Sequence, residues 1–159
     1  MSRWFLLSLL VLIVDQVSKV TVASSMHLYE SIALVPSFQL TYVHNPGAAF
    51  SFLSDAGGWQ RWFFIALSSV VSVLISIWLV RLPAALRWQA TGLALVLGGA
   101  VGNLVDRVLY GYVIDFLDVY YRSWHWPAFN VADAAITIGA VILLVDSFRN
   151  PDSPLQELK

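Results

Sequence analysis

The sequence predicts an all-α membrane protein, a four-transmembrane-helix bundle with a small β-sheet on its outer face. Composition is the first reason: 58% of the 159 residues are hydrophobic and only 12% are charged, about half the charged share of an ordinary soluble domain. The second is a set of four apolar segments long enough to cross a bilayer. The third is a stretch between the first two segments in which apolar and polar residues alternate, as in a strand.

The four spans are expected at approximately residues 4–25, 62–80, 88–107 and 126–146. The last three are nearly free of charge, and Asp133 is the main interruption of the fourth. The first has two interpretations, because Arg3 followed by an apolar stretch also fits a cleavable signal peptide. Asp15 and Lys19 are one helical turn apart, so they can pair on one face and allow this helix to span.

Positive charges indicate the orientation, at Arg3, Arg81, Arg87, Arg149 and Lys159. These residues precede the first span, flank the short loop 81–87 and follow the last span. The positive-inside rule therefore places that loop and both termini in the cytoplasm. Segments 26–61 and 108–125 then face outward, and we expect a single domain over residues 1–159.

The first outer segment does not have helical periodicity. Phe38, Leu40 and Tyr42 alternate with other residues, which is a strand pattern. Asn45 and Gly47 flank a proline in a turn that follows this strand. We expect a small sheet on the outer membrane face. The turn itself is either an ordinary loop or a donor-rich border of a cleft.

Several kinds of chemistry are excluded or disfavoured. A net charge of −1 gives no basic field for nucleic acid. The absence of cysteine excludes disulfides and thiolate metal sites. His27, His44 and His125 lack the clustering that a zinc site needs, and no base accompanies the serines of the second span. We therefore expect neither a metal nor a cofactor.

Two aspartates stand out, because ionisable groups at membrane depth are costly and usually functional. Asp133 shares a helix face with Asn130 and Thr137, and its alternative interpretation is a buried carboxyl satisfied by a neighbouring helix. Asp115 lies between Ile114 and Phe116, which is unusual for a solvated loop charge. Its alternative is a helix N-cap or a turn carboxylate.

The outer end of the third span carries a second polar group. Asn103 and Arg107 are one turn apart on a shared face and can hydrogen-bond the backbone of an extended peptide. Gly98 and Gly102 form a small-xxx-small pair that lets helices approach closely. For Asp106 we expect a structural role, by pairing with Arg107 or capping the helix end.

Antiparallel third and fourth spans would bring Asp115 and Asp133 to the same depth. Two carboxyls that share a site hold one proton between them over a range of pH. The ionised carboxyl can take a proton from water while the protonated one donates to a peptide carbonyl. The pair therefore predicts peptide hydrolysis without a metal or a covalent intermediate. A proton- or cation-coupled transporter and a structural subunit whose polar residues only join helices are the alternatives.

Five sequence blocks, in this order and spacing, resemble the lipoprotein signal peptidase (signal peptidase II) family: Asp15-Gln16-Val17-Ser18-Lys19, Asn45-Pro46-Gly47-Ala48-Ala49-Phe50-Ser51, Gly102-Asn103-Leu104-Val105-Asp106-Arg107, Val113-Ile114-Asp115-Phe116 and Phe129-Asn130-Val131-Ala132-Asp133. They extend over nearly the whole chain. His44, Pro46 and Val105 depart from the residues more usual in the family. None of these departures falls on a candidate catalytic position.

The resemblance implies a multi-pass aspartic endopeptidase of the bacterial inner membrane, with a small periplasmic β-cradle between its first two helices. Such enzymes cut diacylglyceryl-modified prolipoproteins just before the lipidated lipobox cysteine, near the outer leaflet surface, and globomycin-type peptides inhibit them. The resemblance places the catalytic dyad at Asp115 and Asp133. It implies substrate-binding residues at Asn45, Gly47, Asn103, Arg107 and Asn130, and a structural polar pair at Asp15 and Lys19. We further expect membrane lipids as partners and a monomer.

Overall fold

The computed structural model describes residues 2–47 and 57–149. Its elements, in chain order, are α1 (Ser2–Ser25), β1 (Ser31–Val35), β2 (Phe38–Asn45), α2 (Trp59–Arg81), α3 (Arg87–Leu109), β3 (Val113–Tyr121), β4 (Trp124–His125) and α4 (Val131–Arg149). Four of these are helices long and apolar enough to cross a membrane. The prediction of four long apolar helices with a small sheet is therefore confirmed.

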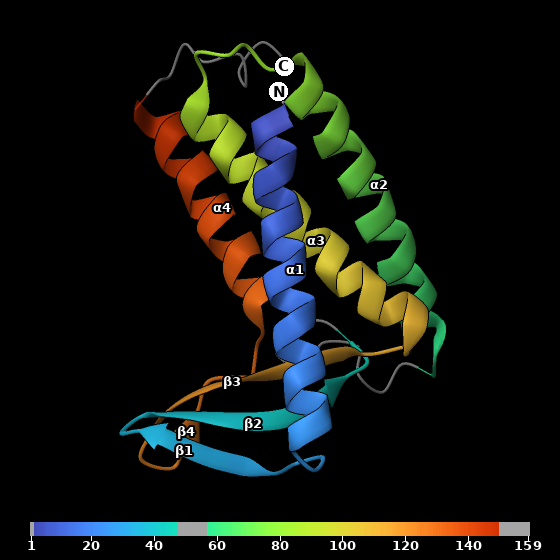
Figure 1. Ribbon diagram of the computed structural model, residues 1–159, viewed down its shortest axis with the longest axis vertical. Helices are drawn as coiled ribbons and strands as arrows, with labels where there is room; N and C mark the ends of the chain where they lie inside the picture. Colours follow the sequence, from blue (N-terminus) through green and yellow to red (C-terminus); the bar gives the residue numbers. More distant parts are fainter. Residues whose placement is uncertain (1, 48–56, 150–159) are drawn as a thin grey trace.

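The helices lie side by side and the sheet lies at one end of the bundle (Figure 1). The start of α1, the connection between α2 and α3, and the end of α4 all lie at the opposite end. Arg81 and Arg87, which flank this connection, are therefore at the end remote from the sheet. This arrangement separates the short connection that carries Arg81 and Arg87 from the end that carries the sheet.

Helix α3 is the centre of the bundle, and each of the other three helices packs against it. Glycines on α3 permit this close approach. A Cβ at Gly98 would lie 2.7 Å from the backbone oxygen of Ser8 on α1. A Cβ at Gly99 would overlap the backbone oxygen of Ala132 at the start of α4. Small residues on successive positions of α3 therefore hold α1 and α4 against two different faces of the helix.

Gly99→Ala is expected to destabilise the protein by about 1–3 kcal/mol, the usual cost of adding a methyl group to a well-packed interface. The added Cβ would meet backbone, which cannot rotate away. Thermal unfolding in detergent, followed by tryptophan fluorescence, measures the effect. Ala66→Val adds more volume at an exposed position of α2 and serves as the control. Equal midpoints for the two variants would contradict close packing at Gly99.

The sheet has the order β1-β2-β3-β4, with antiparallel pairing throughout. The sheet was expected between the first two helices, and β1 and β2 do come from that segment, but β3 and β4 come from the segment between α3 and α4. The register of β2 and β3 shifts between Leu40 and Val43, and such a bulge increases the local twist and re-aims side chains. Beyond the bulge, Val43 is opposite Asp115, so Asp115 is a strand residue rather than a turn or cap.

The sheet is fixed to the bundle by an apolar cluster in which Tyr42, Ile114 and Phe116 meet Val22 and Met26 of the last turn of α1 and the residue that follows it. All five side chains are buried. The residues on both sides of Asp115 are thus anchored in the core. This anchoring sets the position of the Asp115 carboxyl relative to the helices.

The fourth helix begins at Val131, five residues after the expected start at residue 126. The intervening residues are extended, and Phe129 pairs with Leu117 of β3 through N–H···O bonds of 2.7 and 3.0 Å. Pro127 lacks the backbone N–H that a helix interior needs. This segment is apolar because it packs beside the sheet, and it does not form part of the helix.

Candidate active site

Asp133 is held at the first turn of α4 by a reciprocal capping arrangement. The Asn130 side-chain oxygen accepts a hydrogen bond from the Asp133 backbone N–H at 2.9 Å, and the Asn130 backbone N–H donates to Asp133 Oδ2 at 3.2 Å. This is the geometry of a capping box, with Asp in the place usually taken by Glu or Gln. Asp133 Oδ1 accepts a further bond, 2.8 Å long, from the Asn103 side chain.

Asp115 reaches the same place from β3. Its Oδ1 accepts a 2.7 Å hydrogen bond from Asn130 Nδ2, and its Oδ2 accepts a 2.9 Å bond from Asn45 Nδ2. Asn130 thus binds both aspartates at once. Burial, followed by the nearby charge of Asp133, raises the pKa of Asp115 to about 7, although the hydrogen bonds from Asn45 and Asn130 oppose the shift. A pKa in this range allows Asp115 to carry a proton near neutral pH.

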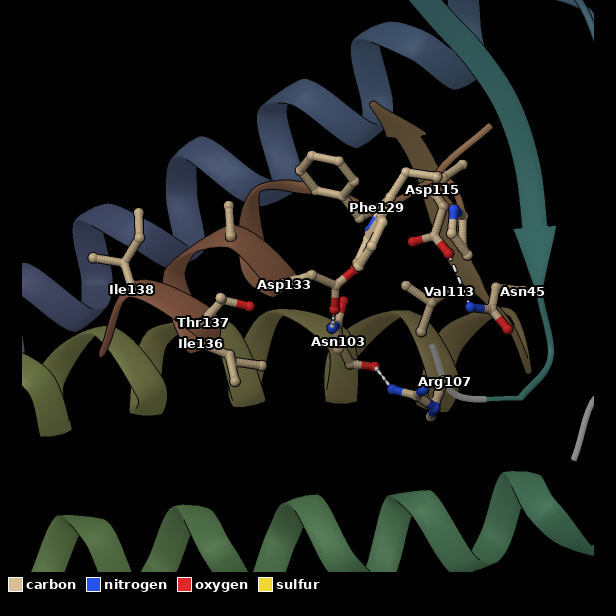
Figure 2. Close-up of a pocket in the computed structure, with 14 residues that line it drawn as sticks. Asn45, Asn103, Arg107, Val113, Asp115, Phe129, Asp133, Ile136, Thr137 and Ile138 are labelled. Atoms are coloured by element: carbon tan, nitrogen blue, oxygen red, sulfur yellow. Dashed lines mark hydrogen bonds between the residues drawn. The ribbon is translucent and has the colours of Figure 1, made fainter. Parts of the chain in front are cut away.

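Both carboxyl groups face one cleft (Figure 2). Its volume is about 530 Å³, within the range of sites for small molecules and short peptides. Asp115, Asp133 and Asn103 supply polar groups, while Ile136 and Ile138 of α4 form part of an apolar wall. Asp115 and Asp133 belong to different elements and are not close in the sequence. The packing of β3 and α4 against α3 brings them together.

A buried lysine lies behind the cleft. Lys19 Nζ lies 2.8 Å from Asp15 Oδ2 and 2.9 Å from Asp106 Oδ2, and it donates a 2.9 Å bond to Asn103 Oδ1. Because an ammonium group has three protons, all its donors are used. With Asn103 Oδ1 bound to Lys19, the amide nitrogen of Asn103 points to Asp133. Lys19 therefore orients a side chain that contacts the cleft.

The two carboxylates bound to Lys19 also hold the surrounding elements. Asp15 Oδ1 accepts the backbone N–H of Ala132 in the first turn of α4 at 2.9 Å. Asp106 Oδ2 accepts the backbone N–H of Ile114 in β3 at 3.1 Å. The expected pairing of Asp106 with Arg107 does not occur, because adjacent residues of a helix point to different faces. Asp106 pairs instead with Lys19 of α1.

Arg107 lies on the cleft from the α3 side. Its guanidinium donates to the carbonyl oxygens of Gly47 at 2.9 Å and Asn103 at 3.2 Å. Gly47 N–H in turn donates to Asn45 Oδ1 at 3.0 Å, which turns the amide of Asn45 toward Asp115. The structure therefore joins Asn45, Gly47 and Arg107 in one corner. Residues 48–51 of the matching sequence block are outside the described part of the chain.

Sequence reasoning missed two side chains near this corner. Arg61 of α2 donates to the carbonyl oxygens of Arg107 and Val108 at 2.9 Å each, and so binds the end of α3. Gln16 donates to Asp106 Oδ1 at 2.9 Å. The position of Gln16 directly after Asp15 was a weak indication of its role. Nothing in the sequence around Arg61 indicates that it binds the end of α3. Within residues 2–47 and 57–149, no group of three metal-ligating side chains converges on the cleft or elsewhere.

Four helices able to cross a membrane, with two carboxyls facing a common cleft near one end of them, define a multi-pass membrane protein. Residues 7–149 match the profile of the signal peptidase (SPase) II family. The chain therefore belongs to the signal peptidase II family, as the sequence blocks predicted.

Known relatives are similar to this chain over almost its full length. The lipoprotein signal peptidase of Pseudoalteromonas translucida is 59% identical over 151 residues, which are 95% of this chain and 90% of the relative. That of Alteromonas mediterranea is 54% identical, over 98% of this chain and 85% of the relative. A solved bacterial membrane enzyme has the same fold, with a TM-score of 0.86 and 28% identity over 95% of this chain and 90% of that structure.

Proposed function

We propose that this protein is a membrane aspartic endopeptidase that removes signal peptides from diacylglyceryl-modified prolipoproteins by cutting before the lipidated cysteine. The observation that carries the proposal is the placement of Asp115 and Asp133 in one cleft, where Asn130 binds both. Family membership and the names of the relatives support the substrate class.

The proposed reaction divides two roles between the carboxyls. Asp115, whose pKa lies at about 7, holds a proton and donates it to the scissile carbonyl oxygen. Asp133 is ionised and takes a proton from the attacking water, whose oxygen bonds to the carbonyl carbon. When the tetrahedral intermediate collapses, the C–N bond breaks, Asp133 returns its proton to the leaving amine, and the carbonyl proton goes back to Asp115. The dyad thus ends the cycle in its starting state.

The walls of the cleft suit a lipidated peptide. Asn103 and Arg107 offer donors to the backbone of an extended peptide. Ile136 and Ile138 continue the wall along α4 with apolar surface, where acyl chains or an apolar signal sequence gain from burial. A globomycin-type peptide would inhibit by occupying this cleft. The proposal includes neither a metal nor a cofactor, and it assigns all chemistry to a monomer.

The proposed orientation puts the sheet in the periplasm and both termini in the cytoplasm. It is supported by the separation of Arg81 and Arg87 from the sheet end of the bundle, because short positively charged loops stay inside. Asp115 and Asp133 are at the sheet end, where α3 ends and α4 begins. The active site would then lie near the outer leaflet of the inner membrane, where a lipid-anchored substrate places its cleavage site.

Activity should fall as pH rises through about 7, because Asp115 must carry a proton to act as the acid. Above this value kcat/KM is expected to decrease about tenfold per pH unit. Initial rates on one lipidated substrate between pH 5 and 9 measure this decrease in kcat/KM. Circular dichroism at each pH shows whether the fold is retained. A rate that keeps rising to pH 9 would contradict the assignment of Asp115 as the proton donor.

The direct test of the substrate class compares a diacylglyceryl-modified prolipoprotein with the same chain lacking the lipid. The purified protein in detergent should cut the lipidated form, and mass spectrometry should place the cut immediately before the modified cysteine. The unmodified chain should be cut at least about 100-fold more slowly, because it lacks the buried acyl area that holds it in the cleft. Equal cleavage of both chains would show that the lipid is not recognised.

A further inference from the structure

A second hollow lies on the sheet beside the cleft. We call it the sheet groove, and its volume is about 530 Å³. Residues 126–128 form a wall of both the groove and the catalytic cleft. Strands β1 to β4 supply the rest of the lining, namely the polar residues Ser31, Gln39, Thr41, Asp118 and His125 and the apolar residue Val43. The cleft is therefore bordered by apolar helix surface on one side and, on the other, by a groove that contains a carboxylate and several hydrogen-bonding side chains.

Asp118 is the charged centre of the groove. Its Oδ2 accepts hydrogen bonds from Gln39 Nε2 at 2.7 Å, Thr41 Oγ1 at 3.0 Å and His125 Nδ1 at 3.0 Å. Burial works against the ionised form, but the bonds from His125, Gln39 and Thr41 outweigh it and lower the pKa of Asp118. Asp118 is therefore an anion near neutral pH.

The groove offers the Asp118 cluster to one half of the proposed substrate, and the cleft offers apolar helix surface to the other. The signal peptide and the acyl chains are apolar and belong beside Ile136 and Ile138. The chain that follows the cut bond must leave toward water. The groove is open, with His125 47% exposed, and it adjoins the dyad through residues 126–128. Asp118 is three residues beyond Asp115 in β3, and an extended chain advances about 3.3 Å per residue, so roughly two to four residues beyond the bond bring it there.

We propose that the residues just after the cleaved bond lie in the sheet groove, where the Asp118 carboxylate disfavours acidic side chains and favours basic or hydrogen-bond-donating ones. The inference rests on the proposed peptidase function and adds a specificity site to it. The site is distinct from the dyad, since neither Asp118 nor His125 borders the cleft. Its contribution is a choice among substrates rather than a chemical step.

A purely structural role for this cluster is the competing explanation, because Asp118 also links β2, β3 and β4. Gln39 and Asp118 are cross-strand partners, and His125 belongs to β4. The two explanations differ in what they predict. A structural link affects all substrates equally, whereas a binding site changes their order of preference.

The test uses lipidated peptides that are identical except at the second and third residues after the cut, which are both Lys, both Ser or both Asp. The wild-type protein should cut the Lys and Ser peptides with kcat/KM at least about threefold above the Asp peptide, a factor of the size expected from one weak charge–charge interaction. The difference should appear in KM, with kcat nearly unchanged. Equal kcat/KM for the three peptides would overturn the inference.

Two variants separate charge from structure. Asp118→Asn removes the charge and should make the three peptides equivalent. His125→Ala removes the 3.0 Å hydrogen bond between His125 Nδ1 and Asp118 Oδ2 but keeps the carboxylate. The preference against the Asp peptide should therefore remain or increase. Glu30→Gln makes the same chemical change at a carboxylate that binds the His27 backbone N–H and should alter nothing. A preference that survives Asp118→Asn, or disappears in His125→Ala, would refute the assignment.

A crosslinking measurement covers the case in which Asp118→Asn does not fold. A photoreactive residue at the third position after the bond, in a peptide bound to the wild-type protein, should label residues 39–41 or 124–126. Labels confined to the helices would overturn the inference. Absence of cleavage of any lipidated peptide by the wild-type protein is a different result, since it would reject the proposed function and the groove assignment with it.

Discussion

Asp115→Asn and Asp133→Asn are each expected to lower kcat by at least about 10³-fold, within the usual contribution of a positioned general acid or base. Asparagine retains the size of aspartate but can neither accept the proton from water nor donate one to the carbonyl oxygen. The change preserves much of the local bonding, because an amide oxygen can still accept from Asn130, Asn45 or Asn103. The loss should therefore appear in kcat while KM stays within a few-fold.

Single-turnover cleavage of a lipidated substrate, with enzyme in excess, measures this effect. Glu30→Gln is the control, because it changes a carboxylate outside the cleft to an amide. All three variants should unfold within a few degrees of the wild type. Near-normal kcat in a folded Asp115→Asn or Asp133→Asn protein would remove that residue from the chemistry.

Lys19→Met is expected to destabilise the protein by about 3–5 kcal/mol, the usual cost of removing one partner from a buried ion pair. Lys19 is almost completely buried, and the carboxylates of Asp15 and Asp106 are equally buried. Methionine matches its length but leaves both carboxylates without the cation. Because these carboxylates also bind the backbone of Ala132 and Ile114, the start of α4 and β3 should loosen together.

The thermal unfolding midpoint in detergent should fall by roughly 10 °C. Arg122→Met, at an exposed cation in the turn between β3 and β4, is the control and should leave the midpoint unchanged. Adding Asp106→Asn to Lys19→Met removes one of the stranded charges and should recover part of the loss. An unchanged midpoint in Lys19→Met would show that the three charges do not stabilise one another.

Much of the bundle was predictable because a bilayer-spanning helix needs a long apolar run, and this chain has four. Asp133 was conspicuous for the same reason, as a carboxyl within such a run on one face with Asn130. The start of α4 was not predictable from hydropathy, because residues 126–129 are as apolar beside the sheet as they would be in lipid. Pro127 was the available signal, since prolines lie at or before helix starts more often than inside them.

The second half of the sheet was missed for a related reason. β3 is rich in β-branched and aromatic residues, a strand signature, but Asp115 and Asp118 interrupt its alternation. Both aspartates have hydrogen-bond partners that only the folded chain brings close. Asp115 binds Asn45 and Asn130, and Asp118 binds Gln39. The three-way binding of Lys19 was likewise out of reach, because its partner Asp106 is distant in sequence. The roles assigned to Asn45, Gly47, Asn103, Arg107 and Asn130 remain predictions.

The central claim is that Asp115 and Asp133 act as one catalytic unit. Single-turnover rates of Asp115→Asn, Asp133→Asn and the double variant, measured on one lipidated substrate, test it most directly. Groups that act together are strongly non-additive, so the double variant should be within a few-fold of either single variant. Losses that multiply, or one variant that remains fully active, would mean that the two carboxyls do not share the reaction.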